Sequence, residues 1–303
     1  VRYYAKLYPQ QAEFYQAEED VLFGIRTWIA RTVDEIHRMA QVEQDLERKN
    51  NLQEMERINE WLIDHPPRTF REVCQFIAWI NMANRTYCRA GAGTQLDECL
   101  RPYYERDKSA GILTDDEARF IIACLFINDP HYYQIGGPDC DGRDVTSPLS
   151  FLILEAAHEV GVTVNLTIRV HDGLDPRLLR RGVEILCEDQ KGCPRFSGDK
   201  ALEEGFMRHG YSAELARRRI AVGCHWMSLP GMEYTLNDLI KINLAKVFEV
   251  AFWEMMEGKE QSVPLLYHLY QKHLTLAIQC VGEGIDFHLE YQHLNAPELM
   301  LNL

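Results

Sequence analysis

Apolar residues recur at helical spacing through the first part of the chain. From Gln11 to Asp64 most residues are charged or polar, while Leu22, Ile25, Trp28, Ile29, Val33 and Ile36 return every three or four positions. This period is typical of amphipathic helices. Pro66-Pro67 ends the pattern, and the stretch from Thr69 to Asn84 is apolar over much of its surface, which predicts a buried helix. Further helices are expected over Leu96 to Arg106 and Thr114 to Ile127.

The pattern changes after Asn128 to short alternating pieces. A Gly/Asp-rich loop (Gly136 to Asp144) precedes a helix over Pro148 to Glu159 and a strand-like segment over Val162 to Val170. A helix from Asp175, a Gly-Cys-Pro turn at 192–194 and a helix from Ser212 follow. Strands that alternate with helices predict an α/β fold.

A long apolar helix is expected near the end of the chain. Thr235 or Asn237 would cap its start, Gly258-Lys259 would end it after Glu257, and most of its surface would be buried.

The segment from Ala221 to Tyr234 is the most unusual one. It carries no charged residue before Glu233, and Gly223, Pro230 and Gly231 exclude a regular helix or a long strand. An uncharged loop of this kind between buried elements predicts a shaped cavity. Cys224, near its start, is a core thiol, a thiolate nucleophile or a radical carrier. The adjacent His225 is poorly placed to act as its base, because neighbours in an extended segment point to opposite faces.

Composition narrows the classes of function. The chain has 303 residues, 46% of them hydrophobic, and a formal net charge of −14. This charge disfavours nucleic acid as a partner. The sequence has no apolar run of membrane-spanning length and no secretion signal, so a cytoplasmic location without membrane association is expected. Nine cysteines without a C-x-x-C pair fit reduced thiols and predict no metal site. Arg217-Arg218-Arg219 is expected to be a solvated face.

Neither end of the sequence has the pattern of a natural terminus. The chain begins at Val1 in a helical pattern and stops in the apolar run 297–303. We therefore expect it to be one piece of a larger protein.

Six short motifs, in order, resemble those of one enzyme superfamily. Leu96-Asp97 with 100–105 (LRPYYE) is similar to "D-Q-x-L-x-P-Y-Y", Gly136-Gly137 with 141–144 (DGRD) to "G-G-x-x-x-x-G-x-D", and 165–171 (NLTIRVH) to "P-N-L-x-x-R-x-H". The turn 192–199 is similar to "G-x-P-x-F-x-x-D", Gly223-Cys224 to a "G-C" loop, and 243–249 (NLAKVFE) to "N-L-x-K-x-x-E". From about Leu96 onward, the chain therefore resembles the glycyl radical enzymes of the pyruvate formate-lyase and glycerol dehydratase superfamily.

The resemblance implies both a fold and a chemistry. The chain would be a fragment (1–303) of a ten-stranded α/β barrel, with 1–130 mainly helical and 131–303 forming the barrel portion that carries the cysteine loop. Cys224 would become the thiyl radical that abstracts hydrogen from a small polar substrate. The radical glycine of an "R-V-x-G-Y"-like motif is not in this sequence, so either the remaining portion of the enzyme or a companion polypeptide would supply it. No bound cofactor is expected: a radical S-adenosylmethionine activating enzyme would install the glycyl radical, and the enzyme would form a homodimer.

Two departures limit the chemistry. Pyruvate formate-lyase has two adjacent cysteines, whereas Gly223 and His225 flank Cys224, which disfavours acetyl transfer. The dehydratases, amine lyases and several decarboxylases share a "C-x-E" signature. In this chain Trp226 occupies the position of the glutamate in that signature. Proton transfer would then fall to His225, Glu233 or His171.

The predicted site combines these candidates with those for substrate binding. It consists of catalytic Cys224, Glu233 and His225, with substrate-binding Trp226, His171 and Asp144. Glu233 could equally be a capping carboxylate, His225 and His171 core histidines, and Trp226 core packing.

Three hypotheses therefore stand. In the first hypothesis, the chain belongs to a glycyl radical lyase or dehydratase that cleaves a C–O, C–N or C–C bond, and it is inactive as an isolated fragment. In the second, it is a polar thiol enzyme that uses Cys224 and a remote histidine. In the third, it is a non-catalytic, degenerate barrel protein.

Overall fold

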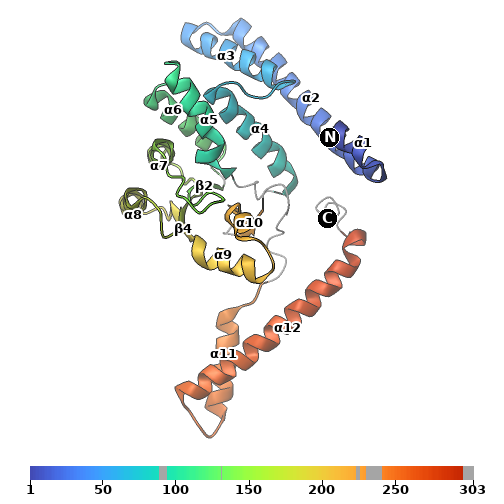
Figure 1. The fold of residues 1–303 in the computed structure, drawn as a ribbon, viewed down its shortest axis with the longest axis vertical. Coiled ribbons are helices and arrows are strands. Elements are labelled where there is room, and N and C mark those ends of the chain that lie inside the picture. Colours follow the sequence, from blue (N-terminus) through green and yellow to red (C-terminus); the bar gives the residue numbers. More distant parts are fainter. Residues whose placement is uncertain (89–93, 131, 223–225, 230–240, 296–303) are drawn as a thin grey trace. The chain divides into compact units, whose positions relative to one another are not determined.

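The computed structural model describes residues 1–88, 94–130, 132–222, 226–229 and 241–295 (Figure 1). The chain divides into two compact units, Val1–Glu233 and Tyr234–Leu303. The prediction of a single domain over 1–303 stays a prediction. Within the described ranges, no helix has both the length and the apolar character needed to cross a membrane.

The chain begins with long helices, as predicted. Short α1 (Arg2–Leu7) and a 3-10 turn (Pro9–Gln11) lead into α2 (Ala12–Val42), α3 (Leu46–Leu62) and α4 (Phe70–Cys88). The Asp45 side chain caps α3 by accepting a hydrogen bond from the Arg48 amide at 2.9 Å. A small apolar cluster of Ile29, Ile58, Leu62 and Trp79 joins α2, α3 and α4.

A parallel sheet forms the centre of the first unit. Among the described residues it has the order β1-β2-β3-β4, with β1 (Thr94–Gln95), β2 (Tyr133–Gly136), β3 (Leu166–Val170) and β4 (Arg195–Gly198). Its connections are the helices α5 (Leu96–Ser109), α6 (Asp115–Asn128), α7 (Pro148–Glu159) and α8 (Pro176–Asp189). Pro148 and Pro176 occupy the first turns of α7 and α8, where no backbone donor is needed. The predicted α/β alternation is therefore confirmed.

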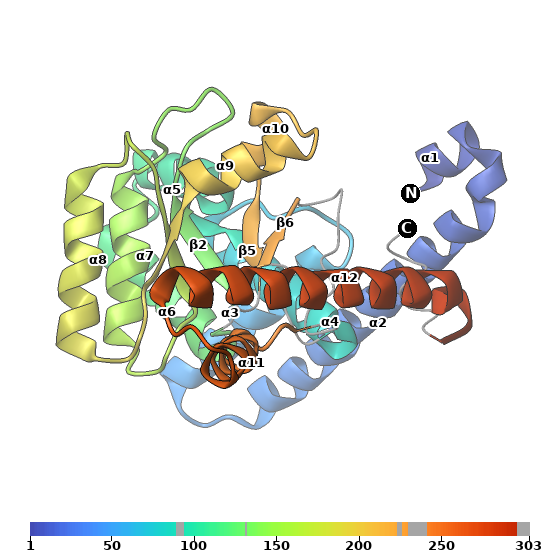
Figure 2. The same ribbon diagram turned by 90° about the horizontal axis from the view of Figure 1, so that it is seen from below.

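The sheet has one apolar and one polar face, because side chains alternate along each strand. The register places Ile135 beside Ile168 and Ile168 beside Phe196 on one face. Gln134 and Thr167, each one residue earlier in its strand, lie beside each other on the other face. Helices α5 to α8 pack on the apolar face in one continuous core. Figures 1 and 2 show α7 and α8 side by side on that side of the strands.

A short antiparallel strand pair follows the parallel sheet. After α9 (Asp199–Arg208) and α10 (Ala213–Arg217), β5 (Ile220–Val222) pairs with β6 (Trp226–Ser228), with Val222 opposite Trp226. The loop predicted over Ala221 to Tyr234 is therefore wrong for residues 221–222 and 226–228, which pair as short strands because each contributes backbone hydrogen bonds to the other.

The second unit contains a helix pair. Asn243 caps α11 (Leu244–Glu257) by accepting from the Lys246 amide at 3.0 Å, and α12 (Val263–Asn295) follows. The proposed caps Thr235 and Asn237 lie outside the described residues. The prediction that this helix is largely buried is wrong: Ala251 and Met255 are buried, whereas Trp253 is 57% exposed. Only one stripe of α11 packs against α12, around Leu269.

These elements constitute part of an α/β architecture. The described strands form an open sheet and a separate strand pair, so the ten-stranded barrel stays a prediction.

Candidate functional site

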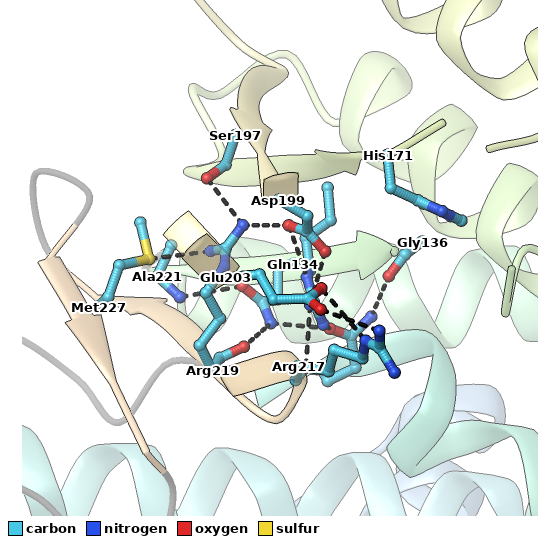
Figure 3. A network of polar contacts seen from close by, with 12 residues as sticks. Gln134, Gly136, His171, Ser197, Asp199, Glu203, Arg217, Arg219, Ala221 and Met227 are labelled. Atoms are coloured by element: carbon cyan, nitrogen blue, oxygen red, sulfur yellow. Dashed lines mark hydrogen bonds and ion pairs between the residues drawn. The ribbon is translucent and has the colours of Figure 1, made fainter. Parts of the chain in front are cut away.

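A charged network fills the polar face of the sheet (Figure 3). Arg169 on β3 donates to both oxygens of Asp199, from Nε at 3.3 Å and from Nη2 at 2.7 Å. Arg219 donates to the same carboxylate and to the Ser197 hydroxyl, the latter at 3.2 Å. The three charged residues are at most 3% exposed. Two guanidinium groups thus share one buried carboxylate, an arrangement that depends on correct geometry because each buried charge costs desolvation energy.

The Arg219 guanidinium remains charged at neutral pH. Burial lowers the pKa of Arg219 to about 10, and the neighbouring Asp199 carboxylate opposes that shift. The network therefore holds two positive charges against one negative charge.

Gln134 extends the network to the antiparallel strand pair. Its Nε2 donates to Gln95 Oε1 at 2.7 Å and to the backbone oxygen of Arg219 at 3.1 Å. Its Oε1 accepts from the Ala221 amide, on β5, at 2.9 Å. Arg219 also donates to the Met227 sulfur, on β6, at 2.8 Å. Polar side chains of the parallel sheet and Arg219 therefore hold both strands that flank residues 223–225 in the chain.

The Gly136-Gly137 motif lets the backbone pass close to this network. Buried Asp97 accepts from the Gly136 amide at 2.8 Å and from the Ser150 hydroxyl at 2.7 Å. Burial raises the pKa of the Asp97 carboxyl, and these hydrogen bonds oppose the shift. Gly137 has φ +93°, and a Cβ atom there would lie 2.7 Å from Arg169 Nε. A side chain at position 137 would therefore displace the guanidinium that binds Asp199.

The structure brings the predicted residues His171 and Asp144 together. His171 Nε2 lies 3.1 Å from Asp144 Oδ1, and the Gly173 amide donates to Nδ1 at 3.3 Å. Because Nδ1 accepts, a neutral ring carries its proton on Nε2 and donates it to Asp144. Asp144 also accepts from the Asp175 amide at 3.0 Å. This pair joins the loops after β2 and β3, and both ring nitrogens are engaged. Its role in substrate binding stays a prediction.

Two cavities lie beside these groups. One of about 410 Å³ borders Gln95, Gln134, Arg169 and Ile220. The other, of about 210 Å³, borders His171, Asp199, Lys200 and Arg217. Both linings combine apolar side chains with polar and charged ones, as is typical of sites for small molecules.

Four of the predicted site residues have no described side chain. Cys224, His225 and Glu233 lie outside the described residues, and Trp226 is described only as backbone in β6. Their roles stay predictions. In the part of the chain that the structure describes, no three His, Cys, Asp or Glu residues are grouped to hold a metal ion.

Sequence reasoning missed the central residue of the network. Arg217-Arg218-Arg219 was expected to be a solvated face, which is wrong for Arg219, only 1% exposed. Arg218 keeps 61% of its side chain exposed and pairs with Glu214. The available signal was position: Arg219 directly precedes the apolar strand Ile220–Val222, whereas Arg217 and Arg218 end a helix. Arg169 and Asp199 were present in the quoted motifs but had no assigned role.

Two curated proteins are examples of relatives with a similar sequence. The chain is 24% identical over 269 residues to isethionate sulfite-lyase of Nitratidesulfovibrio vulgaris, covering 80% of this chain and 32% of the relative. It is 23% identical over 309 residues to trans-4-hydroxy-L-proline dehydratase of Clostridioides difficile, covering 88% of this chain and 39% of that protein. The chain thus spans about a third of the length of the curated relatives that it matches.

A solved structure has a similar fold over the part that superimposes on this chain. A glycyl radical enzyme from Archaeoglobus fulgidus superimposes with a TM-score of 0.73 at 22% identity, over 86% of this chain and 38% of that one. The sequence model of the family described as pyruvate formate lyase-like matches residues 4–273. With nearly the whole chain matched and relatives that are glycyl radical lyases and dehydratases, the chain belongs to the pyruvate formate lyase-like family of glycyl radical enzymes.

Proposed function

We propose that this chain is the cysteine-bearing part of a glycyl radical lyase or dehydratase. The enzyme cleaves a C–O, C–N or C–C bond of a small polar substrate. The Cys224 thiyl radical takes a hydrogen atom from substrate, so that an S–H bond forms as a C–H bond breaks. The proposal is supported by relatives named as a sulfite-lyase, a sulfopropanediol dehydratase and a hydroxyproline dehydratase.

One observation carries the assignment to Cys224. The buried network anchors both β5 and β6, and Cys224 belongs to the three residues that connect these strands in the chain. A radical thiol has to be held at a fixed distance from its reaction partner, and an anchored strand pair meets that requirement. The proposed barrel of ten strands would surround this segment and exclude water.

The partners of the reaction come from outside this sequence. A glycyl radical in the remaining portion of the enzyme, installed by a radical S-adenosylmethionine activating enzyme, would supply the oxidising equivalent. Glu233 or His225 is proposed to transfer the proton, because His171 has both ring nitrogens engaged. Trp226, His171 and Asp144 are proposed to border the substrate. A homodimer and a cytoplasmic location complete the proposal.

The alternatives make different predictions. Acetyl transfer of the pyruvate formate-lyase type is disfavoured by Gly223 and His225 beside Cys224. A polar thiol enzyme would remain active in air and lose activity on alkylation of Cys224. A degenerate barrel protein would show no turnover after activation.

The experiment is anaerobic activation of the full-length polypeptide, followed by electron paramagnetic resonance and assays with a panel of substrates. The panel contains isethionate, (2S)-3-sulfopropanediol, trans-4-hydroxy-L-proline, 4-hydroxyphenylacetate, 1,2-propanediol and glycerol, all taken from the similar proteins. We expect a glycyl radical in wild type and in Cys224→Ala, with turnover lost only in the variant. Cys187→Ala, at an exposed thiol, is the matched control and should retain turnover. Turnover by Cys224→Ala would refute the proposal.

A further inference from the structure

One arginine connects the strand pair to three other elements. Arg219 directly precedes β5, yet its guanidinium reaches Met227 on β6, Ser197 on β4 and Asp199 at the start of α9. Its backbone oxygen accepts from Gln134 on β2. The residue is 1% exposed, although its side chain is charged. Burial of a charge at this depth is costly, so its position requires several specific partners.

The β5–β6 pair depends on such partners for its position. Its ladder has only three residues in each strand. A two-stranded ribbon is at best marginally stable by itself in water. Gln134 supplies an anchor on β5, through the Ala221 amide, and Arg219 supplies one on β6, through Met227. The two anchors are connected, because Gln134 also binds the backbone of Arg219.

We propose that Arg219 and Gln134 are positioning residues that fix the β5–β6 strand pair against the polar face of the parallel sheet. The proposal rests on the proposed function only for its catalytic consequence, since Cys224 lies between the two strands in the chain. Hydrogen-atom transfer requires reacting atoms at roughly 3–3.5 Å, and a displacement of about 1 Å costs on the order of 100-fold in rate. Loosening either anchor therefore lowers the rate of the chemical step more than it weakens substrate binding.

The conservative variant Arg219→Lys separates positioning from simple charge balance. Lysine keeps the positive charge near Asp199, but its single nitrogen lacks the planar fork that reaches three partners in different directions. Met227→Leu is a second, gentler variant, because it conserves volume and removes only the sulfur acceptor. Arg57→Lys is the matched control: Arg57 makes a two-pronged contact with Glu54 at 2.9 and 2.7 Å, but its side chain is 55% exposed and lies on α3.

The structural readout does not depend on catalysis. In the full-length protein, the alkylation rate of Cys224 and the hydrogen exchange of the Ala221 amide are followed by mass spectrometry. We expect Arg219→Lys to accelerate both about tenfold, and Met227→Leu to accelerate them less, because local opening becomes easier. Arg57→Lys should change neither. Cys74 is buried at 4% exposure, and burial raises the pKa of its thiol, so its alkylation reports global unfolding.

The outcomes are unambiguous. Unchanged Cys224 alkylation and Ala221 exchange in both Arg219→Lys and Met227→Leu would overturn the proposal. Equal acceleration at Cys74 would also overturn it, since the network would then stabilise the whole fold rather than position one strand pair. Acceleration confined to Cys224 and Ala221 would support it.

The kinetic readout tests the catalytic consequence. In the activated enzyme, Arg219→Lys should lower kcat by about 10- to 100-fold with little change in KM, because the displaced thiol affects the chemical step. A rise in KM alone would contradict this consequence. If Cys224→Ala retained turnover, the proposed function would fail, while the alkylation and exchange results would still decide whether Arg219 positions the strand pair.

Discussion

The two faces of the parallel sheet are equally buried but are stabilised in different ways. On one face, Ile135 and Ile168 are fully buried among the apolar side chains of α5 to α8. On the other, Arg169, Asp199 and Arg219 are at most 3% exposed and are connected by directed hydrogen bonds. Apolar packing depends mainly on side-chain volume, so an apolar side chain can be substituted by another of similar size. A buried charge network depends on each partner, because removal of one leaves another charge uncompensated.

The difference has a consequence for the site. Strong dependence on geometry is a disadvantage for a scaffold, but it suits groups that have to hold a reacting segment in place. The polar face is the one that contacts β5 and β6, whereas the apolar face packs mainly against α5 to α8 in the described part of the chain. We therefore expect substitutions on the apolar face to change stability alone, and substitutions on the polar face to change both stability and turnover.

The largest effect is expected for Asp199→Asn. The variant keeps the size of the side chain but removes the negative charge between Arg169 and Arg219, so two buried guanidinium groups lose their counter-ion. The free energy of unfolding should fall by about 3–5 kcal/mol in urea titrations. Asp172→Asn, whose side chain is 88% exposed beside Lys200, is the control and should change it by less than about 1 kcal/mol. A loss of similar size in both variants would mean that the network does not act as a buried charge cluster.

A smaller loss is expected for Ile168→Ala on the apolar face. The side chain is fully buried, and truncation leaves a cavity under α8. Unfolding should become easier by about 2–5 kcal/mol, and by only about 0.5–1.5 kcal/mol for Ile168→Val. Activity per folded molecule should be unchanged in both, as measured after separation of unfolded protein. A loss of turnover in fully folded Ile168→Val would contradict the expectation that substitutions on the apolar face change stability alone.

Gly182→Ala should destabilise the same face by overpacking. A Cβ atom on this α8 residue would lie 2.4 Å from Ile168 Cδ1 and 3.3 Å from the Phe196 ring. We expect a loss of about 1–3 kcal/mol from thermal or urea unfolding. Because valine lacks Cδ1, the double variant Gly182→Ala/Ile168→Val should lose less than the sum of the single variants. If the losses of the two single variants simply add in the double variant, the close contact between the new Cβ atom and Ile168 Cδ1 is relieved by movement of other atoms.

The smallest effect is expected for Arg57→Gln. Arg57 and Glu54 form an ion pair that resembles the Arg169–Asp199 contact in its two hydrogen bonds, but it is solvent-exposed. Solvent screening should keep its contribution to stability below about 1 kcal/mol, and added salt should reduce it further. A loss as large as that of Asp199→Asn would show that burial does not explain the difference between the two pairs.

The local elements were predictable because their signals lie close together in the sequence. The helix Pro148–Glu159 agrees in both bounds, since proline at its first turn and a continuous apolar run define it locally. The helix expected from Thr114 begins at Asp115 with Thr114 as its cap, in a capping box with Glu117. The start of the late helix was less predictable: the sequence suggested Thr235 or Asn237 as its cap, and both lie outside the described residues, whereas the structure shows Asn243 capping α11.

The site was predictable only where a motif fixed both residues and order. His171 and Asp144 were named from separate motifs, and the structure brings them within 3.1 Å. Arg219 could not be found in this way, because a run of three arginines is most often exposed, and its one local signal, a place directly before the apolar strand Ile220–Val222, does not by itself predict burial of a charge. Its burial follows from partners 20, 22 and 85 residues away in the chain: Asp199, Ser197 and Gln134.

The sequence by itself determined the family, the α/β alternation and the cysteine to test, because each depends on short-range spacing and on motif order. Only the tertiary structure decided that the sheet has a charged inner network, and that this network holds the strands on either side of residues 223–225. The physical reason is that a buried charge is stable only among partners which the fold brings together from distant positions. Such partners leave no periodic signal in the sequence.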